Sequence, residues 1–451
     1  MLNALVQALK NKELRKRIYF TLFAFVIFKL MTYIPVPLTD PRVLQRLEST
    51  SLLGFADALS GGALKRFSII ALGVSPYITA SIVVQLLQMD IIPIFSEWSK
   101  EGETGRHKLN QVTRYAALGL AFIQALAMAI GFDKLYGGAL LDIPNNQSPT
   151  AIHFVYIAIV MTAGTGATLW LADQITAKGI GNGTSMIIMA GIVSSFPYMI
   201  NDLLKKYVVG LNPATNQYNQ KFKDWIMFSD VKQLLIFLLV IIILILIIVA
   251  IIYMQNATRK IPIQYANRAN AATLRGKKDS NLPIKLNPSG VIPVIFASSL
   301  LSLPITIASF LADDNPVKRY LYLFFDYNQS IGFTLYILLI FLFSFFYAFI
   351  QVSPEKIAEN LRKQGSYIPG VRPGKETENY VSGILLRTTV IGSTYLVIVA
   401  ILPILFTMLT NIPRSVQIGG TSLLIVVGVA QELFNQIETK TKSQKYSGFI
   451  K

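Results

Sequence analysis

The side chains that could perform covalent or metal chemistry are scarce in this sequence. The chain has no cysteine, which excludes disulfides, thiol chemistry and thiolate metal ligands. It has two histidines, His107 and His153, and an apolar segment long enough to span a membrane separates them. The sequence contains no nucleotide motif of the G-x-x-x-x-G-K type. We therefore expect no catalytic residue, no metal site and no cofactor, and any work must be supplied by a partner.

The polar residues inside the apolar segments are mostly uncharged. A charged side chain at the centre of a membrane helix costs about 2.5–3.5 kcal/mol. Lys29 is the clearest exception, and because it lies near the outer end of its segment its side chain can extend to the interface. Contact with a central pathway is the alternative. The uncharged residues, which singly tend to bond their own or a neighbouring helix, are Ser75, Thr79, Ser81, Gln85, Asn182, Thr184, Ser298, Ser299 and Ser302.

One arginine is placed to recognise an anion. Pro354 can open a short amphipathic helix that ends at Gly365. Two Pro-Gly pairs, starting at Pro369 and Pro373, then hold Arg372 at the tip of a loop. A guanidinium held in this way suits bidentate contact with phosphate or carboxylate. Contact with anionic lipid is the alternative for any basic loop, but it does not account for the paired turns.

The composition is that of a polytopic membrane protein. Of 451 residues, 53% are hydrophobic and only 14% are charged, and the mean hydropathy is +0.51. The first apolar run, Ile18–Ile34, follows basic residues and meets Pro35 and Pro37 instead of a small-residue cleavage site. We therefore expect a retained first span rather than a signal peptide.

Ten apolar segments are predicted to span the membrane. With a cytoplasmic N-terminus, about twice as many lysines and arginines fall inside as outside, which favours two cytoplasmic termini. Residues 205–230 form a long external hinge segment, so the predicted parts are residues 1–204, 205–230 and 231–451, with five spans in each half. Since five is odd, similar halves would form an inverted repeat with a pathway between them. The segments are Ile18–Ile34, Phe67–Met89, Val112–Gly131, Ile152–Asp173, Ser185–Leu204, Gln233–Met254, Gly290–Leu311, Gly332–Val352, Leu385–Leu409 and Val416–Leu433.

The stretch Ser51–Leu87 is predicted to contain a re-entrant helix beside a span. Its first apolar piece has about ten residues, whereas crossing the hydrocarbon layer takes about 20, so this piece must fold back. Gly61 and Gly62 follow as a hinge, and the run Phe67–Met89 is long enough to span. Broken helices at membrane depth imply an enclosed cavity. A peripheral amphipathic helix in the interface is the alternative.

Six long stretches of the chain read SGGALKRFSIIALGVSPYITASIVVQLL, ITAKGIGNGTSMIIMAGI, RKIPIQYANR, LNPSGVIPVIFASS, IAENLRKQGSYIPGVRPG and GGTSLLIVVGVAQELFNQIE. In this order, and over essentially the whole chain, they resemble the SecY family, the pore subunits of the bacterial general protein translocon. The resemblance implies an all-α fold of ten transmembrane helices in two inverted, pseudo-symmetric halves around an hourglass pore. It also implies a re-entrant plug helix on the outer side and a lateral gate that opens to lipid.

The resemblance assigns the plug to about residues 51–64 and a pore ring to aliphatic positions. The spacing of 78/82 and of 184/188 is i, i+4, so each pair lies on one helix face. Thr184 departs from an otherwise aliphatic ring. The implied plug and hinge residues are Leu52, Leu53, Phe55, Leu59, Gly61 and Gly62. The implied ring residues are Ile78, Ile82, Thr184, Ile188, Ile295 and Ile425.

The resemblance also implies a gate and a surface for partners. The gate would run between spans two and three and spans seven and eight, with Thr79, Gln85, Ser298 and Ser299 along it. Two large basic cytoplasmic segments, residues 259–285 and 353–379, would face the motor ATPase SecA or a ribosome, whose RNA they would sense by charge. Their basic residues are Arg259, Lys260, Arg268, Lys277, Lys278, Arg372 and Lys375. The small subunits SecE and SecG, signal sequences, unfolded preproteins and lipid complete the implied partners.

We therefore expect a passive, gated channel of the bacterial cytoplasmic membrane that conducts unfolded polypeptide and releases apolar segments into lipid. It is not expected to be an enzyme. A secondary transporter would need a compact polar or charged midplane site, and no buried acid–base relay is evident. An intramembrane hydrolase would need a nucleophile and a base at helical spacing, and the spans offer none.

Overall fold

The computed structural model describes residues 10–40, 57, 59–88, 92–135, 141, 150–204, 231–265, 280–309, 311, 315–410 and 414–447. These residues are mostly helical, and each of the ten predicted segments overlaps one helix. Within the described residues, five helices are long and apolar enough to cross a membrane. They lie within Glu103–Lys134, Ala151–Lys178, Leu238–Asn256, Ser330–Lys363 and Lys375–Leu405.

The described helices follow the chain in two groups. The first group is α2 (Lys12–Met31), α5 (Ser75–Leu87), α6 (Pro93–Lys100), α7 (Glu103–Leu135), α8 (Ala151–Lys178) and α9 (Gly183–Leu204). The second group is α10 (Val231–Asn256), α11 (Ile292–Ser309), α12 (Pro316–Phe325), α13 (Ser330–Gln351), α14 (Pro354–Lys363), α15 (Lys375–Thr410) and α16 (Arg414–Ser447).

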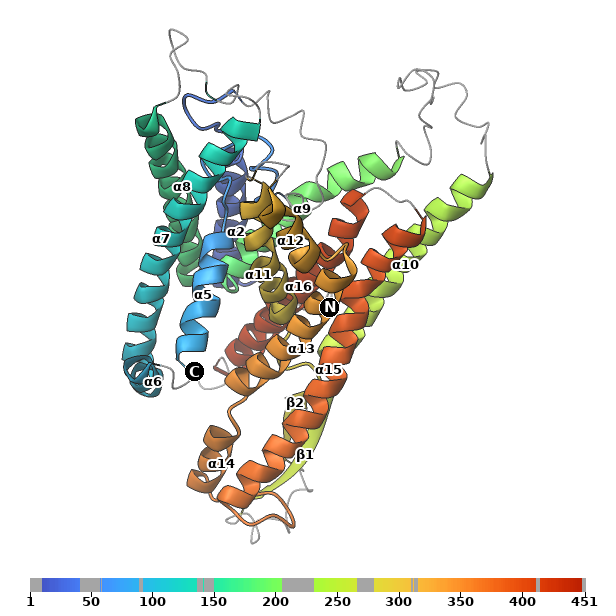
Figure 1. Ribbon diagram of the computed structural model, residues 1–451. Helices are drawn as coiled ribbons and strands as arrows, with labels where there is room; N and C mark the ends of the chain where they lie inside the picture. Colours follow the sequence, from blue (N-terminus) through green and yellow to red (C-terminus); the bar gives the residue numbers. More distant parts are fainter. Residues whose placement is uncertain are drawn as a thin grey trace.

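Contacts between the two groups enclose a common core. Helix α7 packs against α5 and α8, and α11, α13, α15 and α16 pack in that order. Helix α16 also packs against α9, and α11 packs against α5, so the two groups meet along two seams. Figure 1 shows α7 and α8 on one side of the molecule and α10 and α15 on the other, with α11, α13 and α16 between them.

The predicted span Phe67–Met89 is wrong in its first part, because the helix begins only at Ser75. Residues 67–74 form successive turns, with Phe67 at φ 44°. Their backbone is satisfied by the protein, since Ile69 N–H donates to the Ile34 carbonyl at 3.0 Å and the Phe67 carbonyl accepts from Val36 N–H at 2.9 Å. Non-helical backbone buried within protein is permitted at membrane depth.

The expectation of an all-α chain is also wrong in detail, because a small sheet joins the two basic segments. Strand β1 (Thr258–Tyr265) pairs antiparallel with β2 (Ser280–Lys285) and with β3 (Ser366–Tyr367). Ile261 and Ile263 alternate with exposed residues along β1 and pack in a separate apolar cluster. This cluster includes residues of α14 and α15, so the sheet is fixed to the end of the helical body. Figure 1 shows α14, β1 and β2 together at that end.

Candidate functional site

An apolar layer joins four helices from both halves. Five of the predicted ring residues are only 1–7% exposed and belong to one hydrophobic cluster. They come from α5, α9, α11 and α16, and are Ile78, Ile82, Ile188, Ile295 and Ile425. Both groups of helices therefore contribute to one apolar cluster, and these five isoleucines, called the layer below, belong to it.

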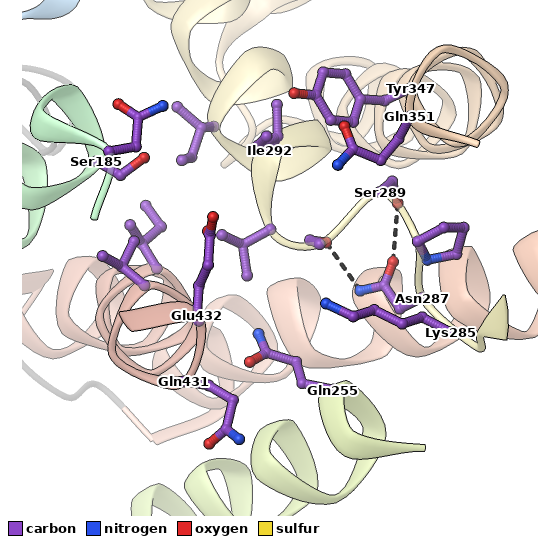
Figure 2. Close-up of a pocket in the computed structure, with 18 of the residues that line it drawn as sticks. Ser185, Gln255, Lys285, Asn287, Ser289, Ile292, Tyr347, Gln351, Gln431 and Glu432 are labelled. Atoms are coloured by element: carbon purple, nitrogen blue, oxygen red, sulfur yellow. Dashed lines mark hydrogen bonds between the residues drawn. The ribbon is translucent and has the colours of Figure 1, made fainter. Parts of the chain in front are cut away.

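A cavity of about 330 Å³ lies beside this layer. Ile188, Ile295 and Ile425 line it, together with residues that are mostly polar. Figure 2 shows Ser185, Gln351 and Glu432 reaching toward the same space from α9, α13 and α16. A polar chamber whose wall includes the aliphatic layer can hold water without extending a water column through the layer.

The polar walls of the chamber were not identified by the sequence analysis, apart from Asn182. Gln255 lies at the end of α10, Gln351 is the last residue of α13, and Lys285 is the last residue of β2. This part of the chamber therefore lies beside the sheet, at the end of the molecule that carries the basic strand β1 (the basic end). The loop before α11 is fixed by Asn287, which donates to the Gly290 carbonyl at 2.9 Å and accepts from Ser289 at 2.9 Å. The additional amide and acidic residues are Gln255, Asn287, Gln351, Gln431, Glu432 and Asn435.

Thr184 lies one helical turn before Ile188 on α9, but it lines a different cavity from the one that Ile188 lines. Its hydroxyl donates to the Asn182 side-chain carbonyl at 2.6 Å at the start of α9. It lines a second cavity of about 190 Å³, where Arg114 of α7 and Asp173 of α8 form an ion pair at 2.8 Å.

The described part of the predicted plug, residue 57 and residues 59–64, is called the stopper segment below, and it lies against α9. Leu59 is 4% exposed and joins the same apolar cluster as the isoleucines. Along α9, Ser185 lines the chamber, Ile188 belongs to the layer, and Gly191 lies so close to the Leu59 backbone that no side chain would fit between them. At about 1.5 Å per residue these contacts follow one another along the helix axis. Along α9, the stopper segment and the chamber therefore lie on opposite sides of Ile188.

The predicted hinge has the backbone that glycine favours. Gly61 has φ 72° and Gly62 has φ 84°, in the left-handed region that disfavours other residues. The predicted plug residues Leu52, Leu53 and Phe55 lie outside the described residues.

The predicted gate residues lie on helices that contact one another. Thr79 donates to the Ser75 carbonyl at 3.2 Å and Gln85 to the Ser81 hydroxyl at 3.1 Å, both within α5. On α11, Ser298 lies 3.5 Å from the Tyr336 hydroxyl of α13, and Ser299 is buried. Among the described residues, these hydrogen bonds do not connect α5 with α11. Apolar side chains therefore make the contact between the two helices.

The basic end exposes Arg259 and Lys260 on β1, Arg372 in the loop after β3, and Lys375 at the start of α15. The turns around Arg372 have the predicted geometry, with Gly370 at φ 81° and Gly374 at φ 108°. The Arg372 carbonyl also accepts from the Thr377 hydroxyl at 2.8 Å, which fixes the loop to α15. The predicted contact residues Arg268, Lys277 and Lys278 lie outside the described residues.

On α14, a neighbouring lysine is already paired. Lys363 donates to Glu359 at 2.8 Å, and this hydrogen bond lowers the pKa of the Glu359 carboxyl. The Glu359 carboxylate is therefore charged at neutral pH. In the part of the chain that the structure describes, no ion pair engages Arg372 or Lys375, so these two are more available to an anionic partner than Lys363 is.

Comparison with known proteins gives a consistent result. The SecY family model matches residues 68–434. The protein translocase subunit SecY of Halalkalibacterium halodurans is 46% identical over 439 residues, which cover 97% of each chain. The protein translocase subunit SecY of Bacillus subtilis is 45% identical over 451 residues, which cover 100% of each chain.

Solved structures share the fold at lower sequence identity. "The structure of a protein conducting channel" superposes with a TM-score of 0.62 at 16% identity, covering 95% of this chain and 92% of that chain. "Sec61 in the Canine ribosome-channel complex from the endoplasmic reticulum" superposes with a TM-score of 0.59 at 16% identity and the same coverage.

Proposed function

This chain belongs to the SecY family, and we propose that it acts as the gated protein-conducting channel of a translocase. It conducts unfolded polypeptide across a membrane and releases apolar segments sideways into lipid. It is a channel subunit rather than an enzyme, so a partner motor or the ribosome supplies the work.

The observation that carries this function is the order of contacts along α9. A polar chamber, an aliphatic layer and a stopper segment follow one another, and the layer is built from both halves. A short apolar constriction disfavours a continuous water column when it is empty. When a chain passes, isoleucine side chains can pack around any sequence because they offer no specific bond. In this proposal Ile78, Ile82, Ile188, Ile295 and Ile425 form the ring.

In the proposed topology, ten helices cross the bacterial cytoplasmic membrane in two inverted halves, residues 1–204 and 231–451. Both termini are cytoplasmic. The excess of basic residues on that side and the sheet at the basic end of the chamber support this orientation. The segment 205–230 is proposed to be an external hinge, along which the halves can part.

The stopper and the seams then have defined roles. Residues 51–64 act as the plug, with Gly61 and Gly62 as its hinge, and burial of Leu59 in the apolar cluster supports this role. The gate lies where α5 and α7 meet α11. Because this contact is apolar, a sufficiently apolar signal sequence can replace it.

The basic end is proposed to receive the partner that supplies work. Arg372, displayed between two turns, and Arg259 and Lys260 on the adjoining strand would bind the motor ATPase SecA or the phosphates of ribosomal RNA. One related channel is described as part of a ribosome–channel complex. The small membrane subunits SecE and SecG are proposed to complete the translocon.

Reconstitution tests the function directly. Vesicles that contain the translocon should protect an unfolded preprotein from external protease only when the motor ATPase and ATP are present. The same vesicles without preprotein should take up no small solutes. Solute uptake without preprotein transport would instead indicate a secondary transporter.

A further inference from the structure

The carbonyl of Gly61 is held by a cationic side chain from another helix. Lys29, near the end of α2, donates from Nζ to the Gly61 oxygen at 3.1 Å. The hydroxyl of Ser194 on α9 lies 3.3 Å from the same oxygen, but it lies 2.8 Å from the Gly191 carbonyl as well. A hydroxyl has one proton to donate, so Lys29 is the stronger donor to Gly61.

The hinge turn does not use this carbonyl for its own closure. Its internal bonds run to Asp57, whose carbonyl accepts from Gly62 N–H at 2.8 Å and from the Ser60 hydroxyl at 3.0 Å. The Asp57 carboxylate accepts from Lys65 N–H at 3.0 Å. The turn is thus closed by Asp57, and the Gly61 carbonyl bonds to the helices that surround it.

A second cation reinforces the attachment. The Arg66 guanidinium lies 4.0 Å from the centre of the Tyr33 ring and donates to the Tyr198 hydroxyl at 3.0 Å. Lys29 Nζ lies 5.5 Å from the centre of the same Tyr33 ring. The segment that contains the hinge is therefore tied by Lys29 to α2, and by Arg66 to Tyr198 of α9 and to Tyr33 just after α2.

We propose that Lys29 is a positioning residue that latches the stopper segment in the closed channel and so sets how strong a signal sequence must be to open it. This inference rests on the proposed channel function. An ammonium at this depth is costly unless it is paired. When the segment moves, the hydrogen bond between Lys29 Nζ and the Gly61 carbonyl is broken, and neither group keeps its partner. A channel without the latch needs less binding free energy from the signal to reach the open state.

The absence of cysteine allows a test that does not depend on transport. Ser60 is 1% exposed in the closed segment, so Ser60→Cys gives a channel with one buried thiol. In the reconstituted Ser60→Cys translocon, an external, membrane-impermeant maleimide labels this thiol. Adding Lys29→Met should raise the labelling rate about tenfold, which is the equivalent of one lost hydrogen bond to a charged group. Lys29→Arg should label within about twofold of the parent, because a guanidinium also donates.

The matched control is Lys318→Met. Lys318 is placed on the same side of the membrane by the proposed topology, and it donates to the Leu311 carbonyl at 3.2 Å away from the stopper. If Lys29→Met labels as slowly as the parent, or if Lys318→Met accelerates labelling equally, the latch is wrong. Ser194→Ala, which should accelerate labelling less than Lys29→Met, provides a second variant if Lys29→Met does not fold.

Transport separates this inference from the channel function itself. Lys29→Met should also admit preproteins with defective signal sequences, whereas Lys29→Arg should not. If the parent translocon moves no preprotein, the channel function fails, and the labelling rates still decide whether Lys29 holds the segment. If transport is normal and the labelling rates are equal, the channel stands and the latch is rejected.

Discussion

Gly191 of α9 approaches the backbone of Leu59 so closely that a Cβ atom on Gly191 would lie 2.6 Å from the Leu59 carbonyl oxygen. Backbone cannot move aside as a flexible side chain can. We therefore predict that Gly191→Ala displaces the stopper. Overpacking costs about 1–3 kcal/mol, so ion leak through the closed channel should rise about tenfold in planar bilayers.

The control for this prediction is Gly119→Ala on α7. A Cβ atom at Gly119 would meet nothing within 4 Å, and alanine is the better helix former. This variant should leak no more than the parent. Equal leak in the two variants would show that Gly191 does not position the stopper.

Arg372 should be needed for motor-driven transport but not for folding. The Arg372 side chain is exposed. The Thr377 hydroxyl donates to the Arg372 backbone carbonyl, and a substitution of the side chain leaves this hydrogen bond in place. Arg372→Glu should abolish ATP-dependent preprotein transport, while Arg372→Lys should retain part of it, because an ammonium cannot reproduce the planar fork. Arg362→Glu, an exposed charge reversal on α14, controls for net charge. Normal transport by Arg372→Glu would contradict the assignment.

Removal of the stopper should open the channel to ions without blocking polypeptide. Deletion of Leu53 to Ser60 removes Leu59 from the apolar cluster. Conductance of the resting channel should rise, and preprotein transport should continue in the same vesicles. An unchanged conductance would mean that these residues do not seal the channel.

The sequence predicts which residues share one face of a helix, but it does not predict whether that face points toward the other half of the protein. The spacing of Ile78 and Ile82 places them on one face whatever that face contacts. Their common cluster with Ile425 depends on how α5 and α16 pack, and only the resemblance predicted it. The turns around Arg372 were predictable because Pro-Gly pairs determine local backbone directly.

The chamber and the sheet could not be predicted in the same way. Gln255 and Gln351 lie at helix ends, where polar residues are expected in any membrane protein, so their type carries no signal of a shared cavity. Glu432 lies inside α16, and its type alone does not say which neighbouring helix it faces. Strand β3 is two residues long and pairs with a strand about 100 residues earlier. The start of α5 was misplaced because the apolar run Phe67–Val74 has the composition of a span but its backbone bonds to the chain before it.

The isoleucine ring is the central part of the proposed channel, and a polar substitution in it is predicted to favour the open state. Ile82 is 3% exposed and Ile425 is 1% exposed, whereas Ile245 of α10 is 56% exposed and faces away from the cluster. An unpaired amide in the apolar layer costs about 1–3 kcal/mol in the closed state and is solvated in the open, hydrated state. Ile82→Asn and Ile425→Asn should therefore shift the channel toward opening, and Ile245→Asn should impair insertion or stability instead.

The most direct measurement is ion conductance of the reconstituted Ile82→Asn and Ile425→Asn channels, taken together with export of a preprotein that has a defective signal sequence. Both variants should leak about tenfold more than the parent and export the defective preprotein, while Ile245→Asn should leave signal selectivity unchanged. If the two variants leak no more than the parent and export no defective preprotein, the isoleucine layer is not the constriction.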